Sequence, residues 1–225
     1  AVQHSVQRAL QERLSLSQTV ANHLEYVVQQ SLRRLEDVGR VEAEWLEDSN
    51  GNGLRETLRD VYFQTIFNEG IFITDTQGKV LWVEPYNQDL LGANFSSYPQ
   101  IRQALDSNRP TISDVMIQNY HQAGSAQETE RAMVLAVAPL KNHDGKIVGI
   151  IGGEMDVMAS NLTRILETVR LGYSGYIDVV DSQGIVLAST KPSQLLTSSD
   201  HNNILVNLIR DRRSAVSTCH SCHEA

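Results

Sequence analysis

The stretch Ile71–Val83 reads Ile-Phe-Ile-Thr-Asp-Thr-Gln-Gly-Lys-Val-Leu-Trp-Val, and the fold can be predicted outward from it. Two runs of β-branched and aromatic residues flank the turn-forming Asp75–Gly78, a pattern that predicts a β-hairpin. The stretch Asp181–Leu187, Asp-Ser-Gln-Gly-Ile-Val-Leu, repeats the turn and the start of the second strand. A Leu-Leu pair follows each hairpin, at Leu90-Leu91 and Leu195-Leu196. This repeat predicts two related modules in tandem.

A long helix is expected before the first hairpin. Between Val2 and Glu47 the apolar residues recur at spacings close to three and four, without a proline and with one glycine, Gly39. At ~1.5 Å per residue, this helix would reach about 70 Å, which is longer than a small domain is wide. It must therefore lie along two packed bodies or pair with another helix. The turn-forming residues Asp48–Gly53 are expected to end it.

The remaining elements of the first module follow from local patterns. A shorter helix is expected over Leu54–Asn68 and another over Tyr98–Leu105. Three further strands are expected over Thr111–Gln118, Arg131–Ala138 and Lys146–Met155, the last two joined by a turn at His143–Gly145.

Composition excludes several classes of function. The chain has 225 residues, 41% of them hydrophobic, and a formal net charge of -8, so it can build a core but suits nucleic acid poorly. No apolar run approaches the roughly 18 residues of a membrane span. No nucleophile with a base, phosphate loop or metal-carboxylate cluster is recognisable, so we do not expect an enzyme.

The two cysteines of the chain lie together in the pentapeptide Cys219-His220-Ser221-Cys222-His223. Two thiols at this spacing can each add to a haem vinyl group, and His223 can then bind the iron as the proximal ligand. The alternatives are a redox dithiol and a zinc site, but four tetrahedral ligands within five residues would be strained. The motif therefore predicts one covalently attached haem c. For the sixth iron ligand, His201 is the first candidate because it is near in sequence, while His23, a methionine or an empty sixth site remains open.

The order of these elements resembles the double Cache (PAS-like) sensor domain over essentially the whole chain. Its helix after the hairpin is matched by Phe95–Leu105, its third strand by Thr111–Val115, and its fourth-to-fifth strand turn by Val137–Leu140 with Gly145–Gly149. The resemblance implies an α+β fold, with a long N-terminal helix followed by tandem Cache modules built on antiparallel sheets. The implied parts are a signalling helix at 1–53, a membrane-distal module at 54–160 and a membrane-proximal module at 161–225. The second module ends before its later strands and is expected to be incomplete.

The resemblance also implies a function. Such domains are the extracytoplasmic input of membrane-anchored receptors, namely chemoreceptors, histidine kinases or cyclic-dinucleotide enzymes, so we expect a periplasmic or extracellular location in a bacterium or archaeon. A flanking anchor helix would hold the domain at the membrane, and the long helix could form a homodimer. The haem would then sense redox state or a small gas. The alternatives are an electron-transfer c-type cytochrome on a Cache fold and a plain ligand-binding receptor whose motif is never loaded.

A small-molecule pocket is expected in the first module. Amino-acid-binding members of the family hold the ligand carboxylate with an arginine at the start of the pocket helix, but the matching positions here read Tyr98-Pro99-Gln100-Ile101. This absence disfavours an amino acid as the ligand. Alternate strand residues should face the pocket, although Asp114 and Arg131 could equally be solvated strand charges. The candidate pocket residues are Tyr98, Asp114, Met116, Arg131 and Glu154.

The haem prediction can be checked by the visible spectrum of the chain produced with c-type maturation. We expect a Soret band that survives denaturation, because thioether bonds hold the group covalently. A shift of the ferrous spectrum with carbon monoxide would indicate an open or weakly held sixth site. A protein without such a band would overturn the prediction.

Overall fold

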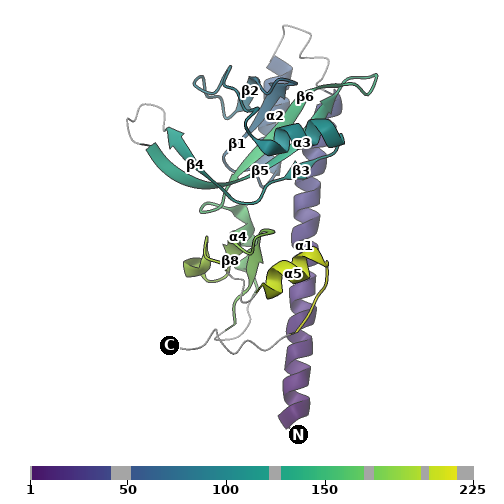
Figure 1. Ribbon diagram of the computed structural model, residues 1–225, viewed down its shortest axis with the longest axis vertical. Helices are drawn as coiled ribbons and strands as arrows, with labels where there is room; N and C mark the ends of the chain where they lie inside the picture. Colours follow the sequence, from purple (N-terminus) through teal and green to yellow (C-terminus); the bar gives the residue numbers. More distant parts are fainter. Residues whose placement is uncertain (1, 42–51, 122–127, 170–174, 199–202, 217–225) are drawn as a thin grey trace. The chain divides into compact units, whose positions relative to one another are not determined.

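The computed structural model describes residues 2–41, 52–121, 128–169, 175–198 and 203–216 (Figure 1). Its helices and antiparallel sheets confirm the predicted α+β fold with a long N-terminal helix. Helix α1 (Val2–Val41) forms as expected, while the rest of its predicted span, 42–47, lies outside the described residues. Among the described residues, no helix is long and apolar enough to cross a membrane.

The chain divides into two compact units. The first module comprises Val27–Ser160, and the second comprises Ala1–Tyr26 together with Asn161–Ala225. Helix α1 contributes its C-terminal part to the first module and its N-terminal part to the second. This division puts part of the predicted 1–53 segment into each module.

The first module is built on a six-stranded antiparallel sheet with the order β2-β1-β6-β5-β3, in which β4 also pairs with β5. Strand β5 is the longest, and it pairs with β6 from Met133↔Asp156 to Lys141↔Ile147. The strands are β1 (Gly70–Asp75), β2 (Val80–Glu84), β3 (Thr111–Ile112), β4 (Met116–His121), β5 (Glu128–Lys141) and β6 (Ile147–Asp156).

The predicted single strand Thr111–Gln118 was wrong, because the chain leaves the ladder between β3 and β4. The Ser113 N–H donates to the Leu135 carbonyl at 2.8 Å, and the Leu135 N–H donates to Ser113 Oγ at 2.9 Å. A side-chain oxygen therefore takes the place of one backbone acceptor along β5. This local substitution could not be read from β propensity.

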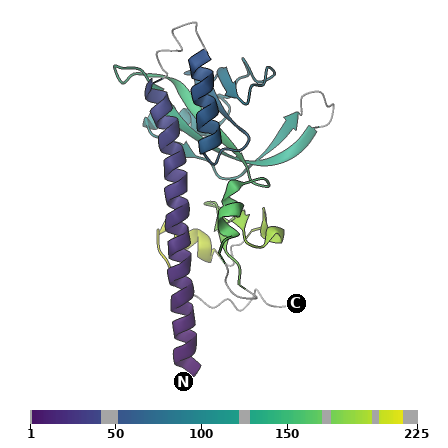
Figure 2. The ribbon, with the colours of Figure 1, turned by 180° about the vertical axis from the view of Figure 1, so that it is seen from behind.

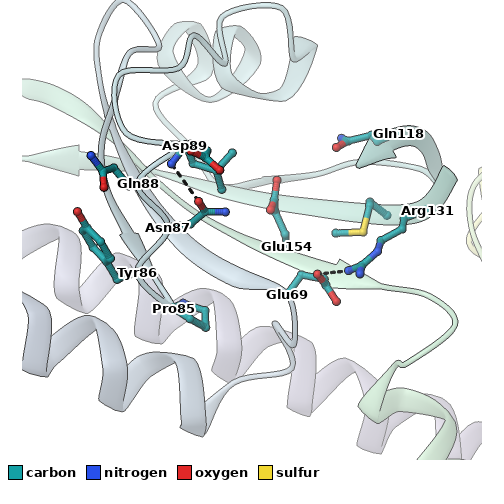
Figure 3. Close-up of a pocket in the computed structure, with 11 residues that line it drawn as sticks. Glu69, Pro85, Tyr86, Asn87, Gln88, Asp89, Gln118, Arg131 and Glu154 are labelled. Carbon is teal, nitrogen blue, oxygen red and sulfur yellow. Dashed lines mark hydrogen bonds and ion pairs between the residues drawn. The ribbon is translucent and has the colours of Figure 1, made fainter. Parts of the chain in front are cut away.

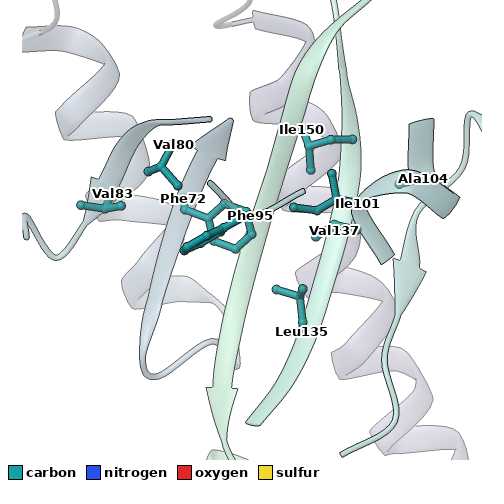
Figure 4. Packing of buried hydrophobic residues seen from close by; sticks show 9 residues of the cluster. All are labelled: Phe72, Val80, Val83, Phe95, Ile101, Ala104, Leu135, Val137 and Ile150. Atoms are coloured by element: carbon teal, nitrogen blue, oxygen red, sulfur yellow. The ribbon is translucent and has the colours of Figure 1, made fainter. Parts of the chain in front are cut away.

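Helices cover both faces of this sheet. Helix α2 (Asn52–Gln64) and the C-terminal part of α1 lie side by side on one face (Figure 2), and the Ile66 N–H donates to Ser31 Oγ at 3.3 Å. Helix α3 (Pro99–Ser107) covers the other face over an apolar cluster (Figure 4). That cluster comprises Phe72, Val80, Val83, Phe95, Ile101, Ala104, Leu135, Val137 and Ile150. Burying each large side chain there stabilises the fold by roughly 1.5–3 kcal/mol.

The second module repeats the first hairpin in atomic detail. Asp75 Oδ1 accepts from the N–H groups of Gln77 and Lys79, and Asp181 Oδ1 accepts from those of Gln183 and Ile185, all at 2.9 Å. The glycine at the end of each turn has a positive φ, 84° in Gly78 and 82° in Gly184, which glycine adopts without strain. The predicted internal repeat is confirmed as a repeat of backbone structure.

Beyond this hairpin, the second module has short elements among its described residues. A two-stranded sheet of β7 (Asp178–Val180) and β8 (Val186–Ser189) contacts helix α4 (Asn161–Leu166). The 3-10 helix η1 (Pro192–Gln194) follows β8, and α5 (Ile204–Arg210) comes later.

Two adjacent glycines of β6 make room for aromatic rings on opposite faces of the sheet. A Cβ at Gly152 would overlap the Phe72 ring, and one at Gly153 would overlap the Phe67 ring. We expect Gly152→Ala to lower the free energy of unfolding by about 1–3 kcal/mol, because a buried ring must move. In a Phe72→Leu background the same change should cost less by at least about 0.5 kcal/mol, measured by urea denaturation. Equal costs in both backgrounds would contradict this packing.

Candidate functional site

A cavity of about 510 Å³ opens in the first module beside the apolar cluster (Figure 3). Strands β4, β5 and β6 contribute one side, the loop after β2 contributes another, and Glu69 precedes β1. The lining residues are Glu69, Pro85, Tyr86, Asn87, Gln88, Asp89, Leu90, Gln118, Arg131, Met133 and Glu154. This volume lies in the range of sites for small organic ligands, about 300–1,000 Å³.

The strand register explains why these side chains meet. Gln118 of β4 lies opposite Arg131 of β5, and Leu135 of β5 lies opposite Glu154 of β6. Because alternate residues of a strand share a face, Arg131, Met133 and Leu135 all point to the same side of the sheet. Along this face the apolar cluster ends and polar residues follow, and the cavity begins at this boundary.

The loop after β2 is shaped by its own hydrogen bonds. Asn87 Oδ1 accepts from the Asp89 N–H at 3.0 Å, and the Asn87 carbonyl accepts from the Leu90 N–H at 3.3 Å. The Gly92 N–H then donates to the Val80 carbonyl at 2.9 Å, which returns the chain to β2. These local bonds set the loop residues opposite Glu154 across the cavity (Figure 3).

An ion pair crosses one end of the cavity. Arg131 Nη1 lies 2.5 Å from Glu69 Oε2, and the two side chains are 30% and 20% exposed. Burial raises the pKa of Glu69, while the Arg131 guanidinium opposes that rise and Asp156 adds to it. Each member of the pair therefore offsets much of the other's charge.

Glu154 is the unusual group of the cavity. Its side chain is mostly buried, and burial together with the negative charge of Glu69 raises the pKa of this carboxyl to about 7. Among the described residues, no hydrogen bond or ion pair of this carboxylate is found. Burial and the same carboxylate raise the pKa of Tyr98, whose hydroxyl is hydrogen-bonded by the Gln118 side chain. A poorly solvated carboxyl without a cation is a mark of functional sites.

The structure brings together part of the predicted pocket. Arg131 and Glu154 line the cavity, whereas Tyr98 packs against the apolar cluster, edge-on to Phe95 with ring centroids 5.2 Å apart. Met116 instead packs against the apolar cluster, and Asp114 is partly buried in the segment between β3 and β4; neither lines the cavity.

Sequence reasoning did not identify Glu69, the loop Pro85–Leu90, Gln118 or Met133. Only Gln118 and Met133 carried a usable signal, because each stands two residues from a named candidate on a predicted strand.

The predicted haem residues Cys219, Cys222 and His223, and the candidate ligand His201, lie outside the described residues. Within the described part of the chain, no group of three or more His, Cys, Asp or Glu side chains is placed to hold a metal ion.

These features define a class: an α+β domain with a repeated PAS-like hairpin and a small-molecule cavity in its first module. The Cache domain family model, dCache_1, matches residues 1–218, and the chain belongs to this family. The match ends one residue before Cys219, so the cysteine motif falls outside it. No curated protein sequence matches the chain.

Three solved structures that share this fold are distant from the chain in sequence. An extracellular ligand binding receptor from Desulfohalobium retbaense is 14% identical with a TM-score of 0.62; the match covers 88% of this chain and 33% of that one. The ligand-binding domain of the Pseudomonas fluorescens chemoreceptor CtaA, solved with L-isoleucine, is 15% identical with a TM-score of 0.61. This match covers 88% of this chain and 76% of that domain. The periplasmic sensory domain of the Campylobacter jejuni chemoreceptor Tlp1 is 10% identical with a TM-score of 0.57. This match covers 89% of this chain and 81% of that domain. The chain thus spans about a third of the length of the Desulfohalobium receptor and about three quarters or more of the two chemoreceptor domains.

The raised pKa of Glu154 makes stability depend on pH. The folded protein holds this proton more tightly than the unfolded chain, so the contribution is complete below the ordinary pKa of 4.5 and is lost as pH rises through about 7. We expect Glu154→Gln to stabilise the protein above pH 7 relative to the wild type, by at most about 3 kcal/mol.

Urea denaturation at pH 5 and pH 8 measures this difference. Glu130→Gln, which removes an exposed carboxylate from β5, is the matched control and should behave like the wild type. The assignment fails if Glu154→Gln keeps the full pH dependence of the wild type.

Proposed function

We propose that the chain is the extracytoplasmic sensor domain of a membrane-anchored signalling receptor, and that it binds a small molecule in the cavity of its first module. The observation that carries this proposal is the cavity of about 510 Å³ with the mostly buried carboxyl of Glu154 inside a Cache module. Membrane anchorage would come from a segment outside these 225 residues. The output region would be that of a chemoreceptor, a histidine kinase or a cyclic-dinucleotide enzyme, and the domain itself would be non-catalytic.

The neighbouring structures support this proposal. They are ligand-binding or sensory domains, one of them periplasmic and one extracellular, and the one from Pseudomonas fluorescens was solved with L-isoleucine. We extend the role of sensor to this chain because it shares the family and the fold. The ligand itself does not transfer at 10–15% identity.

We further propose that the domain carries one covalent haem c on Cys219 and Cys222, with His223 as the proximal iron ligand. The supporting observation is the motif, whose donor set of two thiols and an adjacent imidazole suits the group. When bound, the haem would supply a redox centre or a binding site for a small gas.

The second module offers a surface consistent with this proposal. A cavity of about 400 Å³ is lined by Leu10, Leu14, Tyr176 and the last described residues, Ala215 and Val216. Two residues lie between Val216 and Cys219, so the first attachment point lies within roughly 11 Å of chain from this lining. Arg13 also lines the cavity and could pair with a propionate.

An electron-transfer cytochrome is the alternative for the haem. The acidic chain would suit docking to a basic redox protein. The two functions differ in what the haem does to the rest of the receptor. A sensor requires that oxidation or gas binding changes the receptor's output, whereas a carrier requires only electron exchange.

Ligand binding in the first module can be tested by thermal unfolding of the chain with a library of amines, carboxylates, sugars and nucleobases. A ligand present at 100 times its dissociation constant adds about 2.7 kcal/mol, which raises Tm by roughly 5–10 °C in a protein of this size. We expect at least one class of compound to produce such a shift.

The cavity can be assigned with two tryptophan variants on one strand. Gln118→Trp should abolish the shift, since Gln118 lines the cavity. Ile117→Trp should keep it, because Ile117 is 61% exposed and points to the opposite face of β4. The proposal is wrong if no compound raises Tm, or if both variants respond alike.

A further inference from the structure

The second module contains a larger apolar groove beside the cavity at Leu10 and Val216. It has a volume of about 580 Å³ and lies between the N-terminal part of α1, strand β7 and helix α5 (Figure 1). All of its described lining residues belong to the second module. The groove and the cavity of about 400 Å³ form one continuous depression, because they share the lining residues Leu14, Ser17, Ile177, Asp178 and Ala215.

Apolar side chains of this groove are exposed to an extent that the internal repeat puts on a scale. Ile177 and Val179 stand four and two residues before the aspartate of their turn, as Ile71 and Ile73 do in the first module. Ile71 and Ile73 are each 1% exposed, whereas Ile177 and Val179 are only half-buried. Ile209 of α5 lines the same groove and is 38% exposed. The groove therefore offers apolar surface that a further apolar group can cover.

The charged side chains that line the depression are mostly cationic, in a chain whose net charge is -8. Three of the four described ones are Arg13, Arg212 and Arg213. The fourth is Asp178, whose Oδ1 accepts from Ser189 Oγ at 2.6 Å. Among the described residues, no ion pair of the three arginine side chains is found. An apolar groove with such cations fits an apolar group that carries carboxylates.

The end of α5 fixes the backbone of two of these arginines at the groove. The Arg212 N–H donates to the Ile209 carbonyl at 3.1 Å, and the Arg213 N–H donates to the Leu208 carbonyl at 3.0 Å. These bonds form a Schellman turn, in which the residue after the helix cap takes left-handed backbone angles. That residue is Arg212, with a φ of 50°, a conformation that favours glycine. An arginine held there at a conformational cost is consistent with a role for its charge.

The proposed haem attachment site follows this lining directly in the chain. Ala215 and Val216 line the depression, and Cys219 comes three residues after Val216. A haem is a flat, largely apolar ring with two propionate carboxylates, so the ring matches the apolar lining and the propionates match the arginines. The volume of the groove also lies in the range of cofactor sites, about 300–1,000 Å³.

The described lining supplies neither of the usual second iron ligands, since it contains no histidine and no methionine. His23, a candidate sixth ligand from the sequence, is exposed on α1 and is not among the lining residues. The groove thus suits the ring and the propionates of a haem, and it disfavours His23 as the sixth ligand of a haem held there.

We propose that the haem on Cys219 and Cys222 packs into the groove between α1, β7 and α5, where Arg212 and Arg213 pair with its propionates. This inference rests on the proposed haem attachment and names the protein surface that receives the group. The haem would then contact both α5 and α1. A change at the iron would act on α1, which continues into the first module.

The first test is a redox titration of the chain produced with c-type maturation. A guanidinium beside a propionate disfavours the extra positive charge of ferric haem, so Arg212→Gln combined with Arg213→Gln should lower the midpoint potential. We expect the ratio of oxidised to reduced haem at a fixed potential to rise at least about threefold, which is about 28 mV at about 59 mV per tenfold change for one electron. Arg210→Gln should leave the potential unchanged, because Arg210 pairs with Asp211 on the same helix and lies outside the lining.

The second test compares two isoleucines of α5 with nearly equal exposure. Ile209 lines the groove and is 38% exposed, whereas Ile204 is 39% exposed and lies outside the lining. Each is changed to glutamine in the haem-bearing chain and in a haem-free chain with Cys219→Ser and Cys222→Ser. Ile209→Gln should raise the equilibrium constant for unfolding at least about threefold more with haem than without, measured by urea denaturation, because the haem covers this side chain. Ile204→Gln should have the same effect in both chains.

Two outcomes overturn the inference while the haem attachment itself stands. One is a haem-bearing chain whose midpoint potential is the same with and without the two arginine substitutions. The other is an Ile209→Gln effect that is equal in the haem-bearing and haem-free chains. A chain without a Soret band after denaturation is a different result, because it removes the proposed haem and this inference together.

Discussion

The antiparallel ladder between β5 and β6 is the constraint on which the first module depends. Its register runs from Met133↔Asp156 to Lys141↔Ile147, and the other strands of the sheet join its two edges directly or, in the case of β2, through β1. Strand β1 adds to β6, while β3 and β4 add to β5. Because side chains alternate along a strand, this single register decides which residues face α3 and which face α1 and α2.

The same register produces both the core and the cavity. On the face under α3, Val137 and Leu135 belong to the apolar cluster, and the next two residues on that face, Met133 and Arg131, line the cavity. Glu154 lies opposite Leu135, at the boundary between the two. A slip of one residue would turn Glu154 toward the α2 face and remove the site together with the core. Stability and recognition are thus tied to one set of backbone hydrogen bonds.

The raised pKa of Glu154 implies that ionising this carboxyl costs stability in the folded protein. A buried carboxyl without a cation nearby is disfavoured when it is ionised. The Glu69–Arg131 pair beside it shows that the module can compensate a buried carboxylate within its own chain. Leaving Glu154 without such a partner is consistent with a site that is completed by a ligand. The second module repeats the hairpin but carries the cysteine motif at its end, so the proposed inputs of the two modules are chemically distinct.

The sequence by itself determined the features that depend on neighbours along the chain. The hairpins follow from Asp75 and Asp181, whose carboxylates bind backbone N–H groups two and four residues later, and α1 follows from its apolar spacing. The same local reasoning predicts a haem attachment motif at Cys219–His223, and that prediction remains a proposal.

Tertiary structure alone decided the features that depend on contacts between residues far apart in the sequence. The break between β3 and β4 arises because Ser113 bonds to Leu135, twenty-two residues away. Likewise Glu69 reaches Arg131 across sixty-two residues, and the loop after β2 faces Glu154 only once β1 has paired with β6. Strand periodicity could identify Arg131 and Glu154 as candidate pocket residues, but it could not identify Glu69, which pairs with Arg131 and acts on Glu154. Register and loop closure are set by long-range packing, and local spacing does not encode them.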